Sequence, residues 1–273
     1  MADVVYQAKL AVMRVLEKAP DAIGSVSSVA TLQPHFVPTF DDGPTPVRTP
    51  AVMRALAEHD ATATFFVLST SVRANRGLLA ELAAAGHEIG LHGTDHRHLS
   101  LMSAQEVRES VYAGKSELED ALGTAVRWFR PPYGDQTVSA WRQIEALGMQ
   151  SVIWSSTSHD WNPFVDNDVR VEKATAALKQ GAIVLFHDGH ASLPDGADDG
   201  PEPQLDRYDL VNRVLAGSAE RGLVGRSLGD ALAAGGKVVT RPHFNLMPGP
   251  LNRRLIEKGR VATKARAASA GLI

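Results

Sequence analysis

The chain has 273 residues, 28 basic and 31 acidic side chains, and a formal net charge of −3 at neutral pH. This length and a hydrophobic share of 44% are typical of a globular protein with one large domain or two small ones. The absence of cysteine excludes disulfides, thiolate metal sites and a cysteine nucleophile, and the near-neutral charge gives no reason to expect nucleic acid as a partner.

The first twenty residues have the apolar spacing of an amphipathic helix. Val5, Val12 and Leu16 recur at helical intervals, while two basic side chains interrupt the apolar run. This pattern is not typical of a secretory signal, and no stretch of the chain approaches the about 20 apolar residues of a membrane span. We therefore expect a cytoplasmic protein in which residues 1–33 form an N-terminal helical extension.

From residue 34 onward, short apolar runs alternate with longer stretches of helical periodicity. The expected strands are residues 35–40, 62–68, 88–92, 126–130, 150–155 and 182–187, with a weaker seventh at 223–226. Repeated strand–helix units of this length predict a parallel sheet covered by helices. Because no dinucleotide-type glycine loop is present, about seven such units favour an incomplete barrel over an open doubly wound sheet. We place this barrel domain at residues 34–240.

Three of the intervening helices have clear signals at their ends. Ser103 and Glu106 have the spacing of a capping box, which predicts a helix start. A second helix begins after Thr137 and stops at Gly148, and a third covers residues 167–180. These helices separate successive strands, as a repeated strand–helix fold requires.

Polar side chains follow the expected strands at their carboxyl ends, where barrel enzymes place their chemistry. Asp41 and Asp42 follow the first strand, and adjacent carboxylates repel each other unless a cation or a proton intervenes. His92 and His96 follow the third strand, and in a first helical turn this spacing puts both rings on one face. A pairing of His96 with His98 fits less well, because it does not place the pair opposite Asp42.

One carboxylate with two histidines is a usual open metal set, which leaves positions for water and substrate. The set Asp42, His92 and His96 therefore predicts a bound divalent ion. Zn²⁺ is the default for these donors, with Co²⁺ or Ni²⁺ as alternatives.

Two further strand ends carry groups suited to acid–base chemistry. The run WFRPPYG is stiffened by two prolines, so Arg130 and the backbone amide of Tyr133 have fixed directions. A buried Arg130 beside Asp41 would hold that carboxylate ionised. His187 ends an apolar strand, and pairing with Asp160 would raise its pKa toward that of a working general acid.

Together these runs resemble the five motifs of the polysaccharide deacetylases of carbohydrate esterase family 4. The matching runs are TFDDGP at residues 39–44, H-x-x-x-H at 92–96, RPPY at 130–133, DW at 160–161 and L-x-H at 185–187. The resemblance implies a distorted (β/α)7 barrel and metal-dependent removal of acetyl from an N-acetylated carbohydrate. One departure is Gly93, because the second motif usually has Ser or Thr directly after its first histidine.

The resemblance also implies a role for each residue. Asp41 would be the base, Asp42, His92 and His96 the metal ligands, Arg130 the group that orients Asp41, and His187, tuned by Asp160, the acid. The backbone amide of Tyr133 would hold the oxyanion, and Leu185 and Trp161 would contact the acetyl methyl as apolar walls.

Two other classes of function stay open at this point. One is a related metal-dependent hydrolase of another acyl group, such as a formamide or an O-acetyl ester. The other is a non-catalytic sugar-binding relative. Such a relative would be expected to have lost the base or a metal ligand, and this chain keeps both.

The C-terminal part of the barrel and the segment beyond it carry opposite charges. An acidic segment at residues 195–206 follows the last motif and has no assigned role. Residues 251–266 have a local charge of +5. We treat residues 241–273 as a basic C-terminal extension, which is either a solvated tail or a weak contact to an anionic surface such as a membrane.

Overall fold

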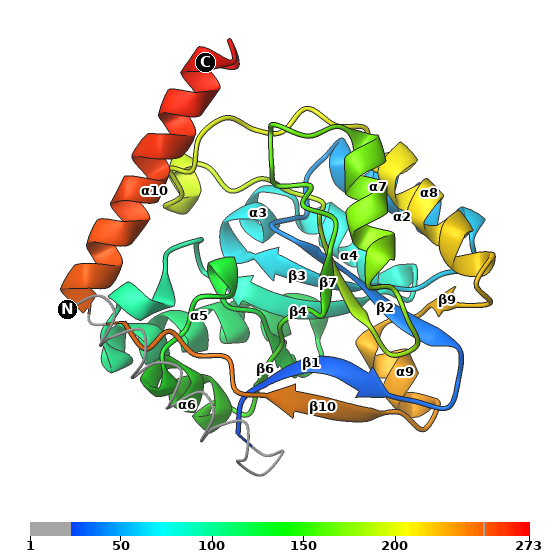
Figure 1. Cartoon of the computed structure of the whole chain (residues 1–273). Coiled ribbons are helices and arrows are strands. Elements are labelled where there is room, and N and C mark those ends of the chain that lie inside the picture. The colour runs from blue at the N-terminus through cyan, green and yellow to red at the C-terminus, as the bar shows by residue number, and fades with distance from the viewer. Residues whose placement is uncertain (1–22, 248) are drawn as a thin grey trace.

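The computed structural model describes residues 23–247 and 249–273, so the expected helix at residues 1–22 lies outside the described part. Seven parallel strands form a curved sheet with the order β6, β5, β4, β3, β2, β8, β7, and β9 pairs with the amino end of β2 (Figure 1). Their bounds are β2 His35–Asp41, β3 Thr64–Leu68, β4 Glu88–Gly93, β5 Trp128–Phe129, β6 Gln150–Ser151, β7 Ser156–Thr157, β8 Ile183–His187 and β9 Val224–Gly225. The fold is therefore an α/β half-barrel, as the strand–helix rhythm predicted.

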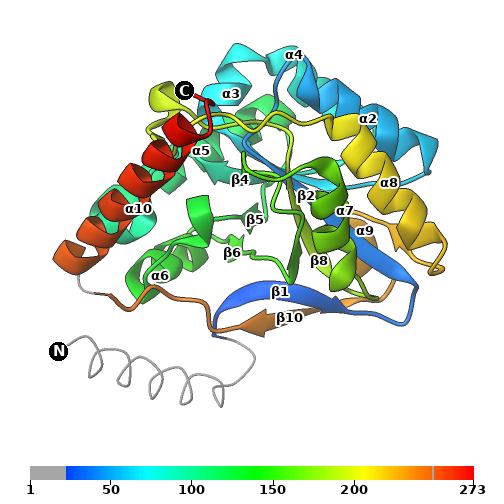
Figure 2. The ribbon, with the colours of Figure 1, turned by 45° about the horizontal axis from the view of Figure 1, so that its top comes forward.

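Helices cover the outer face of the curved sheet (Figure 2). They are α2 Arg48–Glu58, α3 Ser69–Ala74, α4 Arg76–Ala84, α5 Ala104–Leu122, α6 Val138–Ala146, α7 Asn167–Ala176, α8 Arg207–Ala219, α9 Leu228–Ala233 and, beyond the barrel, α10 Gly249–Ser269. Three short 3₁₀ turns lie in the loops: η1 Leu99–Leu101, η2 Pro132–Gly134 and η3 Leu193–Asp195. Among the described residues no helix is both long and apolar enough to cross a bilayer.

Most sequence signals for the helix ends are confirmed. Ser103 and Glu106 form the capping box of α5, and Thr137 accepts a hydrogen bond from the backbone at the start of α6. The third expected helix is shorter than predicted, because α7 ends at Ala176 rather than at residue 180. The expected strand at residues 150–155 is confirmed only at its start, as β6, and a separate short strand, β7, begins just after it at the opposite edge of the sheet.

The chain also contains two strands that the sequence did not predict. β1 (Ser25–Ala30) pairs antiparallel with β10 (Lys237–Arg241). The backbone of β1 also bonds to both sides of the barrel, since Ile153 N donates to the carbonyl of Val26 and Val29 N to that of Gly181, each at 2.8 Å. β1 therefore lies across the gap between β6 and β8.

Residues 25–30 thus belong to the barrel wall, and the prediction that residues 1–33 are a helical extension is wrong for this part. Gly181 shows why the contact is so close. A Cβ on Gly181 would lie 1.8 Å from the carbonyl oxygen of Val29, and Gly181 has φ +76°. Such a contact between distant segments leaves no periodic signal in the sequence.

Three stacked phenylalanines join the strands that carry the polar groups. The ring of Phe40 in β2 lies 5.0 Å from that of Phe65 in β3 and 5.3 Å from that of Phe186 in β8. All three side chains are buried, and burial of each ring contributes about 2–3 kcal/mol relative to an exposed one. Because Asp41 and His187 directly follow Phe40 and Phe186, the same packing fixes the positions of both polar residues.

Candidate metal and catalytic site

The carboxyl ends of the strands bring the predicted site residues together. Asp41 of β2 and His187 of β8 are paired in the sheet register. His92 lies near the end of β4, and Arg130 follows β5. Asp160 lies in the loop after β7 and reaches His187.

Asp42, His92 and His96 form a buried cluster of potential metal ligands. The Oδ1 atom of Asp42 lies 3.4 Å from Nε2 of His92 and 3.4 Å from Nε2 of His96. Among the described residues this oxygen is buried without a hydrogen-bond partner. Buried polar atoms are normally satisfied, so a carboxylate oxygen that faces two imidazole nitrogens and has no donor fits a divalent cation.

The protonation states of this cluster suit a metal ion. Burial alone would raise the pKa of Asp42, but the facing imidazoles of His96, His187 and His92 lower it to about 2. Burial lowers the pKa of His96 to about 4. At neutral pH the carboxylate is therefore ionised and this imidazole is neutral, which are the forms that bind metals.

Hydrogen bonds from the surrounding chain orient the ligands. Nδ1 of His92 donates to the carbonyl of Arg130 at 2.8 Å, which leaves its Nε2 lone pair directed at Asp42. The backbone amide of Ala191 donates to Oδ2 of Asp42 at 3.3 Å. Asp42 itself has φ +75°, a left-handed backbone that costs of order 1–3 kcal/mol and persists only where the surroundings enforce it.

The two histidines converge by a different route from the predicted one. His92 lies in β4 and His96 in the irregular segment that follows, so the expected helical turn is wrong. The chain reverses at Gly93, which has φ +142° and whose Cβ, if present, would lie 2.6 Å from the carbonyl oxygen of Asp95. This explains glycine at the position where Ser or Thr is usual in the family that the motifs resemble.

Nearby groups take up the other polar contacts of this loop. The Thr94 hydroxyl is hydrogen-bonded to that of Ser110 at 2.5 Å. His98, the alternative partner of His96 in the sequence, bonds instead to Asp135 at 2.8 Å. Its ring stacks on Tyr133, with the ring centroids 3.8 Å apart. His98 therefore lies outside the ligand cluster.

Asp41 lies beside this cluster in a buried ion pair. Nη1 of Arg130 donates to Oδ1 of Asp41 at 2.7 Å and to the Thr39 hydroxyl at 2.8 Å. Arg130 is fully buried, with its guanidinium 4.0 Å from the ring of Phe66. The other carboxylate oxygen of Asp41 remains on the side of His92 Nε2, 3.8 Å away. The pair therefore fixes the orientation of the Asp41 carboxylate and leaves one oxygen directed at the cluster.

Asp160 holds His187 by two contacts. Its Oδ1 lies 2.8 Å from Nδ1 of His187, and its Oδ2 accepts from the backbone amide of the same residue at 2.7 Å. Burial would lower the pKa of His187, but Asp160, together with Asp42 and Asp41, raises it to about 9. At neutral pH His187 is therefore a cation whose Nε2 proton is available.

The three predicted substrate-contacting residues differ in exposure. Tyr133 has φ +59°, and its ring meets that of His96 edge-on at 4.3 Å between centroids. Leu185 is 3% exposed within β8. Trp161 is 54% exposed, and its ring stacks on that of His159. Leu185 is thus part of the barrel interior, while Trp161 offers an aromatic face to solvent.

Sequence reasoning missed residues that touch this site. Asp188 directly follows His187 and is buried, and burial raises its pKa to about 7. Its carboxylate accepts from the Thr49 hydroxyl at 2.5 Å. The acidic segment at residues 195–206 also reaches the site, since His96 N donates to the carbonyl of Asp195 at 2.7 Å. The available signal was the position of these acids directly after the last motif.

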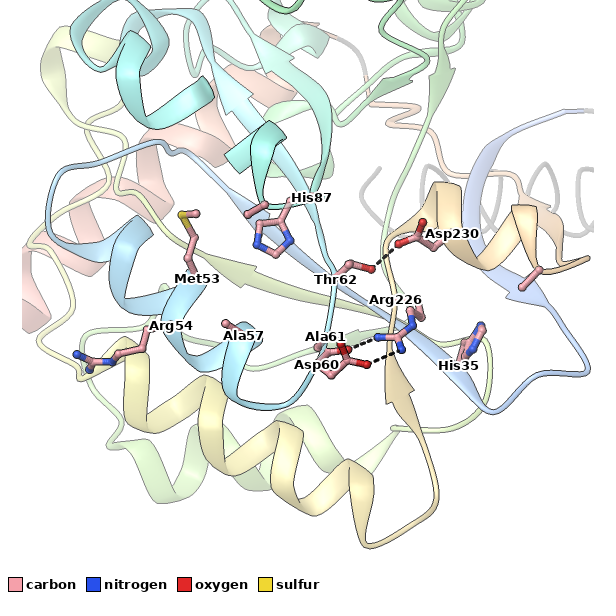
Figure 3. A pocket seen from close by; sticks show the side chains of 12 residues that line it. His35, Met53, Arg54, Ala57, Asp60, Ala61, Thr62, His87, Arg226 and Asp230 are labelled. Atoms are coloured by element: carbon pink, nitrogen blue, oxygen red, sulfur yellow. Dashed lines mark hydrogen bonds and ion pairs between the residues drawn. The ribbon is translucent and has the colours of Figure 1, made fainter. Parts of the chain in front are cut away.

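A cavity of about 860 Å³ lies elsewhere, at the amino ends of the strands (Figure 3). It is lined by residues that include His35, His87, Arg226 and Asp230. Arg226 pairs with Asp60 at 3.2 Å, and the Thr62 hydroxyl donates to Asp230. Nδ1 of His35 and of His87 is buried without a hydrogen-bond partner. The cavity nevertheless lies at the opposite ends of the strands from the ligand cluster, and among the described residues no set of three potential metal ligands converges there.

Comparison with known proteins gives consistent matches in sequence. A sequence profile of the polysaccharide deacetylase family matches residues 29–152. The chain is 32% identical over 214 residues to a chitooligosaccharide deacetylase of Sinorhizobium fredii, which covers 77% of this chain and 98% of that protein. It is 36% identical over 161 residues to a peptidoglycan-N-acetylglucosamine deacetylase of Listeria monocytogenes, covering 59% of this chain but only 34% of that protein.

The fold also resembles solved structures. A carbohydrate esterase family 4 pseudoenzyme from Bacillus anthracis superposes with a TM-score of 0.67 at 21% identity, covering 80% of this chain and 71% of that chain. At this identity the likeness concerns the fold alone. Since a pseudoenzyme shares it, activity has to be argued from the residues of the site.

Proposed function

The chain belongs to the polysaccharide deacetylases of carbohydrate esterase family 4, and we propose that it removes the acetyl group from an N-acetylated sugar in a metal-dependent hydrolysis. The observation that carries this proposal is the buried set of Asp42, His92 and His96 next to the Asp41–Arg130 ion pair. A metal site with an adjacent carboxylate base is an arrangement that can catalyse amide hydrolysis.

Asp42, His92 and His96 would hold the divalent ion, for which we propose Zn²⁺. When bound, such an ion polarises an acyl carbonyl and lowers the pKa of water. Asp41 accepts the proton of the attacking water, because its second oxygen faces the cluster. Arg130 donates to the Asp41 carboxylate and fixes its orientation throughout.

The remaining groups act on the charges that develop during the reaction. The backbone amide of Tyr133 donates to the oxyanion that forms when the carbonyl is attacked, a kind of contact that is commonly worth several kcal/mol. His187 then gives its Nε2 proton to the departing amine, which is otherwise a poor leaving group. Asp160 keeps His187 protonated until that step. The products are a free amine and acetate.

For the substrate we propose a glycan that contains N-acetylglucosamine. The two relatives described above are deacetylases of chitooligosaccharides and of peptidoglycan N-acetylglucosamine, although the chain spans only about a third of the length of the Listeria protein. The exposed ring of Trp161 supports a sugar substrate, because pyranose faces pack on aromatic rings.

Acetate release tests the proposal. N-acetylated chitooligosaccharides, peptidoglycan fragments and O-acetylated sugars are incubated with the purified protein, with chelator-stripped protein, and with stripped protein given Zn²⁺ or Co²⁺. We expect release from an N-acetylated sugar that is lost on chelation and restored by metal. Asp41→Asn should lower the rate about 10²–10⁴-fold, whereas Asp60→Asn, the same change at the other end of the barrel, should not.

Each other result would overturn the proposal in a different way. Release that survives both chelation and Asp41→Asn contradicts the metal–aspartate mechanism. Release from O-acetyl esters alone indicates an esterase. Absence of release from a protein that still binds one metal indicates another acyl group, and absence of both indicates a non-catalytic relative.

A further inference from the structure

The basic C-terminal extension is not a solvated tail. It continues from β10 into the helix α10, which lies beside residues 190–206 in both views (Figures 1 and 2). Two basic residues one turn apart on α10 face neighbouring acids of the acidic segment. Arg260 Nε lies 3.4 Å from Asp199 Oδ1, and Lys264 Nζ lies 2.5 Å from Asp198 Oδ1. The positive charge of the extension is thus partly matched within the chain.

The Asp199–Arg260 ion pair contacts Tyr133, a residue of the candidate active site. The Tyr133 hydroxyl donates to Asp199, and the Arg260 guanidinium lies beside both groups. On the other side, the Tyr133 ring stacks on His98 and meets the metal-ligand candidate His96 edge-on. The side chain of Tyr133 is therefore held between the acidic segment and two histidines.

The backbone of Tyr133 needs such support. Its φ of +59° lies in the left-handed region, which a non-glycine residue keeps only where the surroundings over-determine it. The preceding prolines restrict the approach of the chain but do not set the φ of Tyr133. The hydrogen bond to Asp199 and the ring contacts fix the side chain, and through it the direction of the backbone amide.

We propose that Asp199 and Arg260 are positioning residues, which hold Tyr133 so that its backbone amide stays directed at the oxyanion. This role rests on the proposed deacetylase function, and it ties α10, which lies outside the family profile, to turnover. Further contacts hold the start of α10 near the loop that contains Tyr133. Asn252 donates to the Ser100 hydroxyl at 2.7 Å, and Ser100 donates to Asp135, which follows that loop's 3₁₀ turn.

A purely structural role of Asp199 and Arg260 would lower the melting temperature when the pair is lost, whereas a positioning role lowers turnover instead. The side chains of Asp199 and Arg260 are 37% and 24% exposed, and ion pairs of this exposure contribute little to stability. Loss of the pair should therefore leave the melting temperature nearly unchanged. The effect on turnover should be larger, because misplacing an oxyanion donor acts on the transition state.

The test compares Arg260→Met with Arg254→Met on the zinc-loaded protein. Arg254 is an exposed residue of the same helix that has no hydrogen bond or ion pair to another described residue. We expect Arg260→Met and Asp199→Asn to lower kcat about 10-fold, less than the about 100-fold or more that follows removal of an oxyanion donor. KM and the melting temperature should stay close to those of the parent. Arg260→Lys should restore most of the rate, and the double variant should be no worse than the worse single variant.

Binding of acetate, titrated into the zinc-loaded protein, gives a readout that needs no turnover. Acetate presents a carboxylate oxygen to the same amide, so Arg260→Met should weaken its binding several-fold and Arg254→Met should not. If no acylated substrate is turned over, the proposed function fails while this comparison still tests the positioning role. Equal acetate affinity and equal kcat for the two variants would overturn that role, as would a rate loss that merely follows a fall in melting temperature.

Discussion

The two ends of the barrel carry the same kinds of polar side chain but hold them differently. At the amino ends, Arg226 pairs with Asp60 and Thr62 with Asp230, around a cavity of about 860 Å³. At the carboxyl ends, the Oδ1 atom of Asp42 is buried, faces two imidazoles and has no hydrogen-bond donor among the described residues. At the amino ends the charged side chains are paired, although Nδ1 of His35 and of His87 is buried without a partner, whereas at the carboxyl ends a charged oxygen is left without one.

This difference shows which observation identifies a functional site in this protein. A cavity requires only that side chains leave room, whereas an unsatisfied buried charge costs several kcal/mol unless something binds to it. The carboxyl end also stores backbone strain at Asp42 and Tyr133. Backbone strain and an unsatisfied buried acceptor coincide there, and four experiments test whether this contrast is real.

The largest effect is expected from Asp42→Ala. Removing the only carboxylate of the ligand cluster should lower Zn²⁺ affinity by more than about 100-fold, since even lost supporting groups cost about 10–100-fold. Competition with a chromophoric chelator measures the affinity. Asp230→Ala, at the amino end, is the matched control and should leave Zn²⁺ affinity unchanged. Equal affinities for the two variants would remove the contrast between the barrel ends.

The second largest effect is expected from Asp160→Asn. His187 must be protonated to act as the acid, so the rate falls as pH rises through its pKa, which is about 9 with Asp160 present. Without this carboxylate, burial lowers that pKa, and the alkaline limb of kcat/KM should move to lower pH, with a loss of about 100-fold at neutral pH. The pH–rate profile measures both.

Asp166→Asn is the control for this charge change. Asp166 caps α7 in the same loop region, and Asn is an equally good cap. An alkaline limb that stays in place in Asp160→Asn would contradict the assignment of His187 as the acid.

A smaller effect is expected from Gly93→Ala, compared with Gly123→Ala. Both glycines have positive φ, but a Cβ at residue 93 would lie 2.6 Å from a carbonyl oxygen, whereas one at residue 123 meets nothing within 4 Å. Each change should cost about 1–2 kcal/mol for the backbone alone. Gly93→Ala should cost more and should also weaken Zn²⁺ binding. Chemical denaturation measures the loss of stability, and metal titration measures the loss of Zn²⁺ affinity. Equal losses in Gly93→Ala and Gly123→Ala would exclude a special role for Gly93 in shaping the metal site.

The smallest effect is expected from Arg226→Met at the amino end. The partner carboxylate of Asp60 is 99% exposed, so the ion pair contributes about 0–1 kcal/mol to stability. We expect kcat/KM to stay within about twofold of the parent. A drop of tenfold or more would show that the large cavity takes part in the reaction.

Much of the fold and of the candidate site was predictable because its signals are local. The capping box of Ser103 and Glu106 and the cap at Thr137 are short-range contacts, and both are present. Asp42 and His92 lie at strand ends that the apolar runs marked. The relative geometry of His92 and His96 was not predictable. Their spacing of four residues indicated a helical turn, but the chain forms an irregular loop after Gly93, which has a positive φ.

Contacts between distant segments account for the rest. β1 pairs with β10 more than 200 residues away, and neither strand has a strong apolar alternation. The acidic segment and the basic extension were both visible as charge, but the sequence did not indicate that Asp199 meets Arg260 and Tyr133. A run of charged residues in the sequence gives the sign of a surface, but it does not indicate which other segment of the chain contacts that surface.

The residue types suited to metal binding and proton transfer were recognisable from the amino-acid sequence, because they occur at the carboxyl ends of recognisable strands. Which of these groups lie in contact follows from the folded arrangement. It left Asp42 unsatisfied between His92 and His96 while it paired Arg226 with Asp60. The reason is physical: an electrostatic interaction depends on distance and burial, and for residues far apart in the chain both are set by packing.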